Sequence, residues 1–372
     1  MKVSFVDLLP QYSNLKVEID AELKNIILTS SFIGGIAVEE FENLLCDIEH
    51  RDYSVGLKSG TSALILALKS LELPEESEVI TTTLTAVPTV EAIVQAGLRP
   101  VLCDVDSNTA QISLESVKKS INSKTKVILP VHLYGTPAPI QELNEICIER
   151  DLTLIEDVAQ AQGAFFDGKR VGTLGLISCY SFFPSKCLGG FGDSGAITTN
   201  DENLAEKIRA YANHGRTEKY VHSSIGVNDR IDSLQAAVLK IKLPFLKLWN
   251  EMRNSVANKY LEGLKNIPDL ILPSFPSGTI PAWHLFVIRT SKRDKLSKFL
   301  KDSGIGTGLH YPIPVHLHPA YEFLSYPKGS FPVAEYYGDN VLSLPIYPFM
   351  EDDKVDYVID KVNEFSNMDL SS

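Results

Sequence analysis

Lys186 stands in the setting of this chain that most suggests chemistry. It ends the segment 181–186 (SFFPSK), which is aromatic, almost free of charge and followed by a glycine-rich turn. A setting poor in polar groups lowers the pKa of a lysine, and the neutral amine can then attack a carbonyl carbon. A single lysine is far more often a solvated surface residue, so the inference depends on the groups that accompany it.

A carboxylate ahead of this lysine strengthens the chemical interpretation. Asp157 follows Glu156 at the carboxyl end of an expected strand, where open α/β sheets place their ligands. A lysine that can form a Schiff base, with an acidic partner for a pyridinium nitrogen, is what a pyridoxal phosphate (PLP) site requires. Taken alone, Asp157 could equally cap a helix or lie in a surface loop. Gln160, just after it, could contact the 3′-oxygen or the face of the cofactor ring.

A turn earlier in the chain could hold a phosphate group. Gly60 and Thr61 lie where a turn leads into an apolar helix. Helix N-terminal amides with a nearby hydroxyl form an anion site, and Ser181 could add a second hydroxyl. The alternative for this turn is a plain helix N-cap by Ser59 or Thr61.

A glycine run after the lysine has the spacing of a dinucleotide-binding loop. Gly190, Gly192 and Gly195 form a single G-x-G-x-x-G, the one feature that would favour a NAD-dependent sugar dehydrogenase. That motif requires a strand before it and a helix after it, whereas residues 196–199 (AITT) are typical of a strand. We therefore interpret the run as a turn that lets the backbone pass close to a cofactor.

Histidines gather in a late segment of the chain, at His310, His316 and His318. They could bind zinc, but Pro312 and Pro314 keep the segment extended and no acidic residue lies among them. We expect no metal here. Substrate contact and exposure to solvent are the remaining alternatives.

The composition is that of an ordinary globular protein, with 44% hydrophobic and 22% charged residues among 372. No apolar run approaches the roughly 18 residues of a membrane span, and the N-terminus lacks the apolar core of a signal peptide. Five scattered cysteines without a C-x-x-C pair favour a reducing compartment, so we expect a cytoplasmic protein without a membrane partner. A net charge of −12 disfavours non-specific binding to nucleic acid.

Short apolar segments alternate with helical ones in the first half of the chain. The expected strands and helices follow one another at 78–81, 86–96, 101–104, 113–121, 127–131, 139–150 and 153–155. This alternation predicts an α/β fold with a large, mainly parallel mixed sheet covered on both faces. Residues 177–180 and 196–199 have no helix between them, so we expect them to form a hairpin on this sheet.

Helical periodicity also indicates an N-terminal helix at 13–28 and a long helical region that breaks near Pro244. A proline-rich stretch then leads into a smaller α+β part, whose expected elements are a strand at 283–289 and helices at 293–303 and 355–365. We expect two domains, a large PLP-binding domain at 1–250 that includes the N-terminal helix, and a small C-terminal α+β domain at 251–372.

Several short motifs occur along the chain in one order. They are residues 59–63 (SGTSA), 131–135 (VHLYG), 156–161 (EDVAQA), 181–186 (SFFPSK), 192–196 (GDSGA), 214–215 (HG), 226–232 (GVNDRID), 234–237 (LQAA) and 310–312 (HYP). Together they resemble the DegT/DnrJ/EryC1/StrS family of PLP-dependent nucleotide-sugar aminotransferases over nearly the whole chain. The resemblance implies the aspartate-aminotransferase fold (PLP fold type I) and a homodimer with active sites at the subunit interface.

The resemblance also implies roles for single residues. Lys186 looks like the catalytic lysine that binds the cofactor covalently, Asp157 like the partner of the pyridinium nitrogen, and Gln160 like the residue beside the 3′-oxygen. The implied phosphate contacts come from the same chain at Gly60, Thr61 and Ser181, and from the neighbouring subunit at Asn228.

Three positions depart from the family pattern. Thr85 is followed by Ala86, where the family commonly has an aromatic residue that stacks on the cofactor ring. Gln162 replaces a histidine, so the role of that position is open. Cys187 stands where asparagine or threonine is more usual, either as a small packing residue or as an oxidation-sensitive thiol. None of the three removes a group that the chemistry needs.

The implied reaction moves the amino group of L-glutamate to a keto carbon of a nucleotide-linked sugar through pyridoxamine phosphate. Residues 283–289 and 310–317 most resemble members that act on C3 of dTDP-3-keto-6-deoxyhexoses, with Tyr311 and His316 near the sugar. One alternative is amination at C4 of a dTDP- or UDP-4-keto sugar. Another, of a different class, is a non-catalytic regulatory protein that retains the fold.

Overall fold

The computed structural model describes residues 1–370, and a seven-stranded sheet forms its centre. In sheet order the strands are β1 (Tyr53–Leu57), β9 (Gly195–Thr199), β8 (Ile177–Ser181), β5 (Thr153–Asp157), β4 (Thr125–Ile128), β2 (Glu78–Thr82) and β3 (Arg99–Cys103). Strand β9 is antiparallel to both of its neighbours, β1 and β8, and the remaining pairs of the sheet are parallel. The predicted mainly parallel mixed sheet and the β8–β9 hairpin are therefore confirmed.

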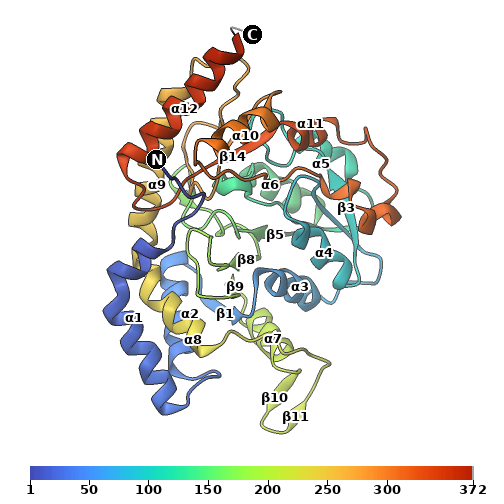
Figure 1. The fold of residues 1–372 in the computed structure, drawn as a ribbon. Helices are drawn as coiled ribbons and strands as arrows, with labels where there is room; N and C mark the ends of the chain where they lie inside the picture. The colour runs from blue at the N-terminus through green and yellow to red at the C-terminus, as the bar shows by residue number, and fades with distance from the viewer. Residues whose placement is uncertain (371–372) are drawn as a thin grey trace.

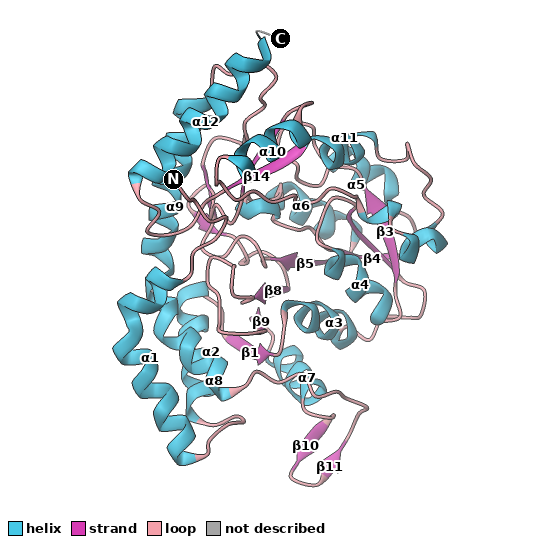
Figure 2. Cartoon of the chain, in the orientation of Figure 1, coloured by secondary structure: helices cyan, strands magenta, loops and turns pink. Residues whose placement is uncertain are grey.

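Helices cover both faces of this sheet (Figure 2). One face packs against α3 (Gly60–Ser70), α4 (Val87–Gln95) and α7 (Glu202–Ala212). The other face packs against α2 (Ile36–Glu49), α5 (Leu114–Ser120), α6 (Ile140–Arg150) and α8 (Ser233–Lys242). Every residue of β2 and β9 is buried, as expected for strands between two helical layers.

The expected long helical region is interrupted as predicted. It consists of α8, the 3-10 turn η2 (Leu243–Phe245), which contains Pro244, and α9 (Leu246–Leu264). The N-terminal helix α1 (Leu9–Thr29) lies along α8 (Figure 1). Helix α9 contributes Trp249 to the core beneath the sheet and Tyr260 to a second core in the C-terminal part.

The C-terminal part is an α+β unit. Its elements are η3 (Val315–Leu317), η4 (Pro319–Leu324), the antiparallel pair β13 (Phe286–Arg289) and β14 (Val341–Leu344), and the helices α10 (Arg293–Asp302), α11 (Pro332–Asn340) and α12 (Asp352–Leu370). The strand expected from residue 283 begins only at Phe286, because Trp283 has a positive φ of 49°. Val3 packs into this C-terminal core, so the division at residue 250 stays a prediction.

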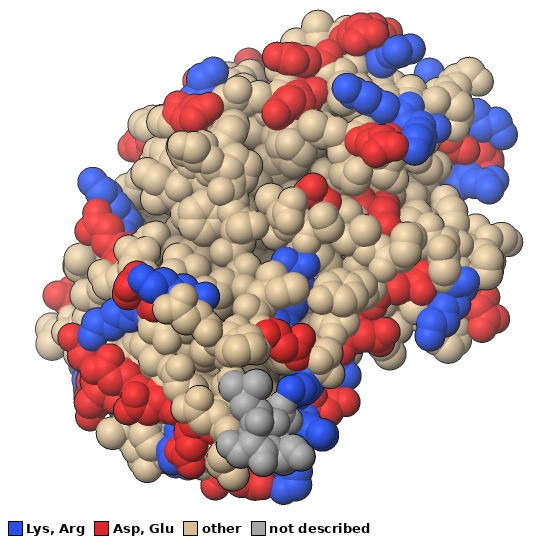
Figure 3. All heavy atoms as spheres, turned by 90° about the horizontal axis from the view of Figure 1, so that it is seen from above, with Lys and Arg blue, Asp and Glu red and all other residues tan. Residues whose placement is uncertain are grey.

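A short hairpin projects from the body of the molecule (Figures 1 and 2). It consists of β10 (Arg216–Glu218) and β11 (Val221–His222), whose residues are exposed. The other small elements are η1 (Leu133–Gly135) and a three-stranded sheet of β12 (Thr279–Ile280), β6 (Phe165–Phe166) and β7 (Lys169–Arg170). The face in Figure 3 carries acidic and basic side chains interspersed, most of them towards its rim and a few near its centre. Among residues 1–370, no helix has both the length and the apolarity to cross a bilayer.

The core under the sheet gives a prediction about stability. Trp249 is 1% exposed, whereas its neighbour Leu248 is 45% exposed. Replacing Trp249 by alanine should lower the free energy of unfolding by about 3–5 kcal/mol, because it removes a large buried side chain and leaves a cavity. Urea unfolding followed by circular dichroism measures this, with Leu248→Ala as the matched exposed control. Equal effects of the two substitutions would contradict the packing described for α9.

Candidate active site

The ends of three strands meet around one pocket of ≈ 280 Å³. Strand β1 leads into the turn before α3, β5 ends at Asp157, and β8 ends at Ser181. Six of the residues predicted for the cofactor line this pocket: Gly60, Thr61, Asp157, Gln160, Ser181 and Lys186. A larger hollow of ≈ 440 Å³ lies beside the first turns of α5 and α6, lined by three acidic residues and no lysine or arginine. Chemistry, and not size, therefore identifies the site.

Asp157 presents a buried carboxylate to the pocket. The residue is 4% exposed, and its carboxylate accepts hydrogen bonds from the Thr89 hydroxyl at 3.0 Å and the Ala159 amide at 3.1 Å. Burial raises the pKa of this carboxyl, although both hydrogen bonds and the charge of Lys186 act in the opposite direction. Within the described residues, each oxygen thus accepts one hydrogen bond, which leaves capacity for a further cationic or N–H partner.

Lys186 lies on a short irregular segment that follows β8. Its amide donates to the Phe183 carbonyl at 2.8 Å and so closes a tight turn. Burial lowers the pKa of its amine to about 8, a change that the neighbouring charge of Asp157 partly opposes. Within the described residues, this amine forms no hydrogen bond or ion pair. The amine is therefore available as a nucleophile and as a proton carrier.

The turn between β1 and α3 offers a place for an anion. Ser59 caps α3 by accepting from the Ser62 amide at 3.1 Å, so the cap expected as an alternative is present. The cap leaves Gly60 and Thr61 in the first turn of the helix, next to Ser181 in the same pocket. A Cβ on Gly60 would lie 2.6 Å from the Cβ of Ser181, so only glycine permits this close approach. Helix amides and two hydroxyls are suited to a phosphate.

Gln160 joins the pocket to the late part of the chain. Its Oε1 accepts from the Tyr134 amide at 2.8 Å, and its Nε2 donates to the Tyr311 hydroxyl at 3.1 Å. Burial raises the pKa of Tyr311 to about 12, so this phenol stays neutral at physiological pH. Tyr311, which the resemblance places near a sugar, is thereby linked directly to a residue that lines the pocket.

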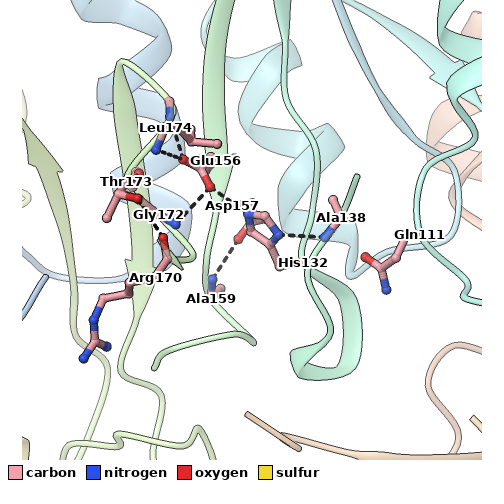
Figure 4. A network of polar contacts seen from close by, with 12 residues as sticks. Gln111, His132, Ala138, Glu156, Asp157, Ala159, Arg170, Gly172, Thr173 and Leu174 are labelled. Carbon is pink, nitrogen blue, oxygen red and sulfur yellow. Dashed lines mark hydrogen bonds and ion pairs between the residues drawn. The ribbon is translucent and has the colours of Figure 1, made fainter. Parts of the chain in front are cut away.

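A buried network supports the strand that carries Asp157 (Figure 4). The Glu156 carboxylate lies 3.0 Å from His132 Nε2 and accepts from the amides of Gly172, Leu174 and Gly175. His132 Nδ1 accepts from the Ala138 amide at 2.9 Å, so Nε2 carries the proton that Glu156 receives as a hydrogen bond. Burial raises the pKa of the Glu156 carboxyl, but the histidine and the amides outweigh it and hold this pKa below its usual range.

The three departures from the family pattern occupy different places. Ala86 lines the pocket next to Thr85. Gln162 is 1% exposed and bonds to the backbone on both sides of residues 182–187, the lysine segment that carries Lys186. Cys187 is fully buried, its thiol lies 3.5 Å from the Ala282 carbonyl, and burial raises its thiol pKa. These buried surroundings favour the interpretation of Cys187 as a small packing residue.

Three predicted site residues are not part of the lining of this pocket: Asn228, His316 and Tyr311, the last of which bonds to Gln160. Asn228 is exposed at the base of the projecting hairpin, where it bridges Asn213. His316 is 3% exposed, with Nδ1 at 2.8 Å from the Thr83 hydroxyl and Nε2 at 3.0 Å from the Glu335 carboxylate. Both ring nitrogens of His316 have partners within the chain, so its contact with a sugar stays a prediction. Among the described residues, no group of metal-ligating side chains converges.

The structure also places residues at the site that sequence reasoning did not single out. The Thr89 hydroxyl bonds to Asp157 and also lies 3.0 Å from the hydroxyl of Thr85, which precedes α4. The position of Thr85 after β2, at the carboxyl edge of the sheet, is the signal that could have found the pair. His284 is 8% exposed with no hydrogen-bond partner recorded for its Nδ1. Burial and the nearby charge of Lys186 lower its pKa well below the ordinary histidine range.

The residues of the pocket fit pyridoxal phosphate. The unpartnered amine of Lys186 suits its aldehyde, and the buried carboxylate of Asp157 suits a protonated ring nitrogen. The α3 turn and Ser181 suit its phosphate. The three groups occupy one cavity, so a single molecule could engage them together.

The lowered pKa of Lys186 gives a prediction about reactivity. An ordinary lysine amine has a pKa of about 10.4, whereas burial lowers that of Lys186 to about 8. Only the neutral amine attacks formaldehyde, so reductive methylation of Lys186 in the cofactor-free protein should rise with pH and be half-maximal near pH 8. Mass spectrometry of the peptide that contains Lys186 measures this rate. A midpoint near that of an ordinary lysine would show that the amine is solvated.

Most of this chain matches one known protein family and several known proteins. The model of the DegT/DnrJ/EryC1/StrS aminotransferase family matches residues 13–363. A dTDP-3-amino-3,4,6-trideoxy-alpha-D-glucose transaminase from Streptomyces venezuelae is 40% identical over 98% of this chain and 96% of its own length. A pleiotropic regulatory protein from Geobacillus stearothermophilus is also 40% identical, over 98% of this chain and 99% of its own. A UDP-N-acetyl-3-dehydro-alpha-D-glucosamine 3-aminotransferase from Acidithiobacillus ferrooxidans is 37% identical, over 95% of each chain.

Solved structures agree in fold. DesV from S. venezuelae, in complex with a ketimine intermediate, superposes with a TM-score of 0.96 at 40% identity over 98% of each chain. NtdA from Bacillus subtilis, with bound cofactor PMP, superposes with a TM-score of 0.91 at 30% identity over 98% of this chain and 85% of its own. The aspartate-aminotransferase type of fold and the PLP cofactor are thereby confirmed. The chain belongs to the DegT/DnrJ/EryC1/StrS aminotransferase family.

Proposed function

We propose that this protein transfers the amino group of L-glutamate to C3 of a dTDP-linked 3-keto-6-deoxyhexose, with PLP as cofactor. The observation that carries the proposal is the meeting of Lys186, Asp157 and the α3 turn in one pocket. The Streptomyces relative, named as a transaminase of a dTDP-3-amino sugar, supports the choice of substrate.

Each cofactor residue has a role that its surroundings support. Lys186 would bind the cofactor, and Asp157 would hold the ring nitrogen protonated through its buried carboxylate. Gly60, Thr61 and Ser181 would bind the phosphate, while Gln160 would contact the ring beside its 3′-oxygen. Bound PLP supplies an electron sink for the electrons released when a Cα–H bond breaks.

Lys186 would also act as the acid and base of the reaction. With a pKa of about 8, its Nζ is neutral in an appreciable fraction of molecules near neutral pH. It can therefore take a proton from a substrate carbon and return it to another position, which a permanently charged amine could not do. Tyr311, neutral and bonded to Gln160, would then face the sugar.

Other substrates are supported less directly. The Acidithiobacillus relative is named for a UDP-linked 3-dehydro sugar, so the same carbon on a UDP carrier is the first alternative. Amination at C4 is the second. A regulatory role is suggested by the name of the Geobacillus relative, but the retention of Lys186, Asp157 and Gln160 in one pocket favours an enzyme.

We also propose that the protein is a homodimer with shared active sites. Asn228 lies outside the pocket of its own chain, at the base of the exposed hairpin. Large apolar side chains near this hairpin and near the start of α2 are exposed, among them Tyr220 at 84%, Ile225 at 100% and Ile36 at 73%. A partner subunit would cover such groups and receive Asn228 at its own cofactor phosphate.

The first test is spectroscopic. The purified protein loaded with PLP should be yellow, lose its visible band with L-glutamate, and regain it with the dTDP-3-keto-6-deoxyhexose but not with the 4-keto isomer. Lys186→Ala should lower the turnover by at least about 10⁴-fold, because one residue provides both covalent binding and proton transfer. Recovery of the band with the 4-keto sugar alone would move the amination to C4. A protein that never binds PLP would overturn the proposal.

Mixing two variants tests the shared site. Asn228→Asp should weaken PLP binding by about 10-fold or more, because it places a carboxylate beside the phosphate. Hybrid dimers of Lys186→Ala and Asn228→Asp chains contain one site with both residues intact. After unfolding and refolding together, at a PLP concentration that loads the wild type but not Asn228→Asp alone, the mixture should recover about a quarter of the wild-type activity, whereas neither variant alone does. No recovery in a mixture whose hybrid dimers are verified by mass would contradict the placement of Asn228.

A further inference from the structure

Gln162 contacts both ends of the segment that carries Lys186. Its Nε2 donates to the Ser181 carbonyl at 2.6 Å, just before that segment, and its Oε1 accepts from the Leu188 amide at 3.0 Å, just after it. A longer contact of 3.5 Å joins Nε2 to the Leu188 carbonyl. The side chain is 1% exposed, so these bonds form away from competing water.

The backbone of Gln162 is itself held in place. Asn250 of α9 donates from Nδ2 to the Gln162 carbonyl at 2.8 Å. The next residue, Gly163, has a φ of +76°, and a Cβ there would lie 2.7 Å from the same Asn250 nitrogen. The glutamine is therefore attached on one side to a long helix of the core and on the other to the lysine segment.

The lysine segment has few other fixed points. Phe182 donates to Ser194 at 2.8 Å, and its own carbonyl accepts from Gly190 at 2.8 Å. Beyond the segment, Lys242 donates to the Gly189 carbonyl. Between these points, residues 183–187 form neither a helix nor a strand.

Burial of the Lys186 amine favours movement of this weakly held segment, because the charged form of the amine is better solvated by water. A segment free to shift would move the amine towards solvent. We propose that Gln162 is a positioning residue, whose carboxamide binds the two ends of the lysine segment and keeps the Lys186 amine in the pocket. The proposal rests on the role of Lys186 in the proposed function.

The carboxamide suits this task better than other side chains of similar size. It donates to a carbonyl and accepts from an amide at once. Methionine fills the space but does neither, and a histidine, the residue usual in the family pattern, has one nitrogen for each task in a shorter ring. Gln162→Met should therefore release the segment, and Gln162→His should restore part of the restraint.

A second buried glutamine provides a matched control. Gln111 is 2% exposed and also bridges backbone, with Nε2 at 3.2 Å from the Leu133 carbonyl and Oε1 at 3.2 Å from the Leu133 amide. Among the described residues, its side chain bonds to Thr109 and Leu133 and not to the lysine segment. Gln111→Met removes the same chemical groups from the interior and should lower stability without altering Lys186.

The experiment measures reductive methylation of Lys186 against pH in the cofactor-free proteins, beside the urea stability of each. At pH 8 the methylation rate in Gln162→Met should fall about five- to tenfold, which corresponds to a rise of about one unit in the amine pKa. Gln162→His should lie between this variant and the wild type, and Gln111→Met should match the wild type. In the PLP-loaded proteins, the pH midpoint of the visible band should move only in the Gln162 variants.

Three outcomes decide the matter. A wild-type methylation profile in Gln162→Met would overturn the proposal, since the glutamine would then be a packing residue only. An equal shift in Gln111→Met would overturn it too, because the effect would follow from general loosening. If Gln162→Met does not fold, Gln162→His supplies the decision through the same profile. Methylation needs neither glutamate nor sugar, so a failure here is distinct from a failure of the transamination test.

Discussion

The structure depends on keeping two ionisable groups, Lys186 and Asp157, out of water in one pocket without joining them. Burial lowers the pKa of the lysine and raises that of the aspartic acid, and the charge of each partly reverses the effect on the other. No ion pair between them is recorded in the described residues. A direct pair would fix the lysine in its charged form and remove its nucleophilicity. The pocket keeps the groups close enough to interact and far enough apart to react.

Two adjacent residues of strand β5, Glu156 and Asp157, have different surroundings and different roles. Successive side chains of a strand point to opposite faces, so Glu156 and Asp157 face different surroundings. The Glu156 carboxylate accepts hydrogen bonds from three backbone amides and from His132, which together stabilise its charge inside the protein. Asp157, by contrast, accepts hydrogen bonds from no described residue other than Thr89 and Ala159, and it faces the pocket. One carboxylate is used to fix the end of the strand, and the fixed strand presents the other to a ligand.

The sequence was sufficient for the features that arise locally. Alternating segments predicted the sheet, Pro244 predicted the break before α9, and the residues that line the pocket follow strand ends or a helix start. What it could not predict are contacts between distant parts of the chain. Gln162 meets Leu188 and Asn250 through the folding of three separate segments. The His316 ring likewise bonds to Thr83 and Glu335, partners that the sequence did not indicate, and its contact with a sugar stays a prediction.

The residues proposed for substrate contact stand on different elements from those proposed for the cofactor. The proposed cofactor groups stand on strand ends and the α3 turn, which the central sheet fixes, whereas Tyr311 belongs to a late segment outside that sheet. The Gln160–Tyr311 hydrogen bond couples the two regions directly. Relatives of similar identity carry names for dTDP-linked and UDP-linked sugars and for a regulator. Similar overall identity thus accompanies different named sugars, which fits the proposal that the late segment with Tyr311, and not the cofactor pocket, contacts the sugar.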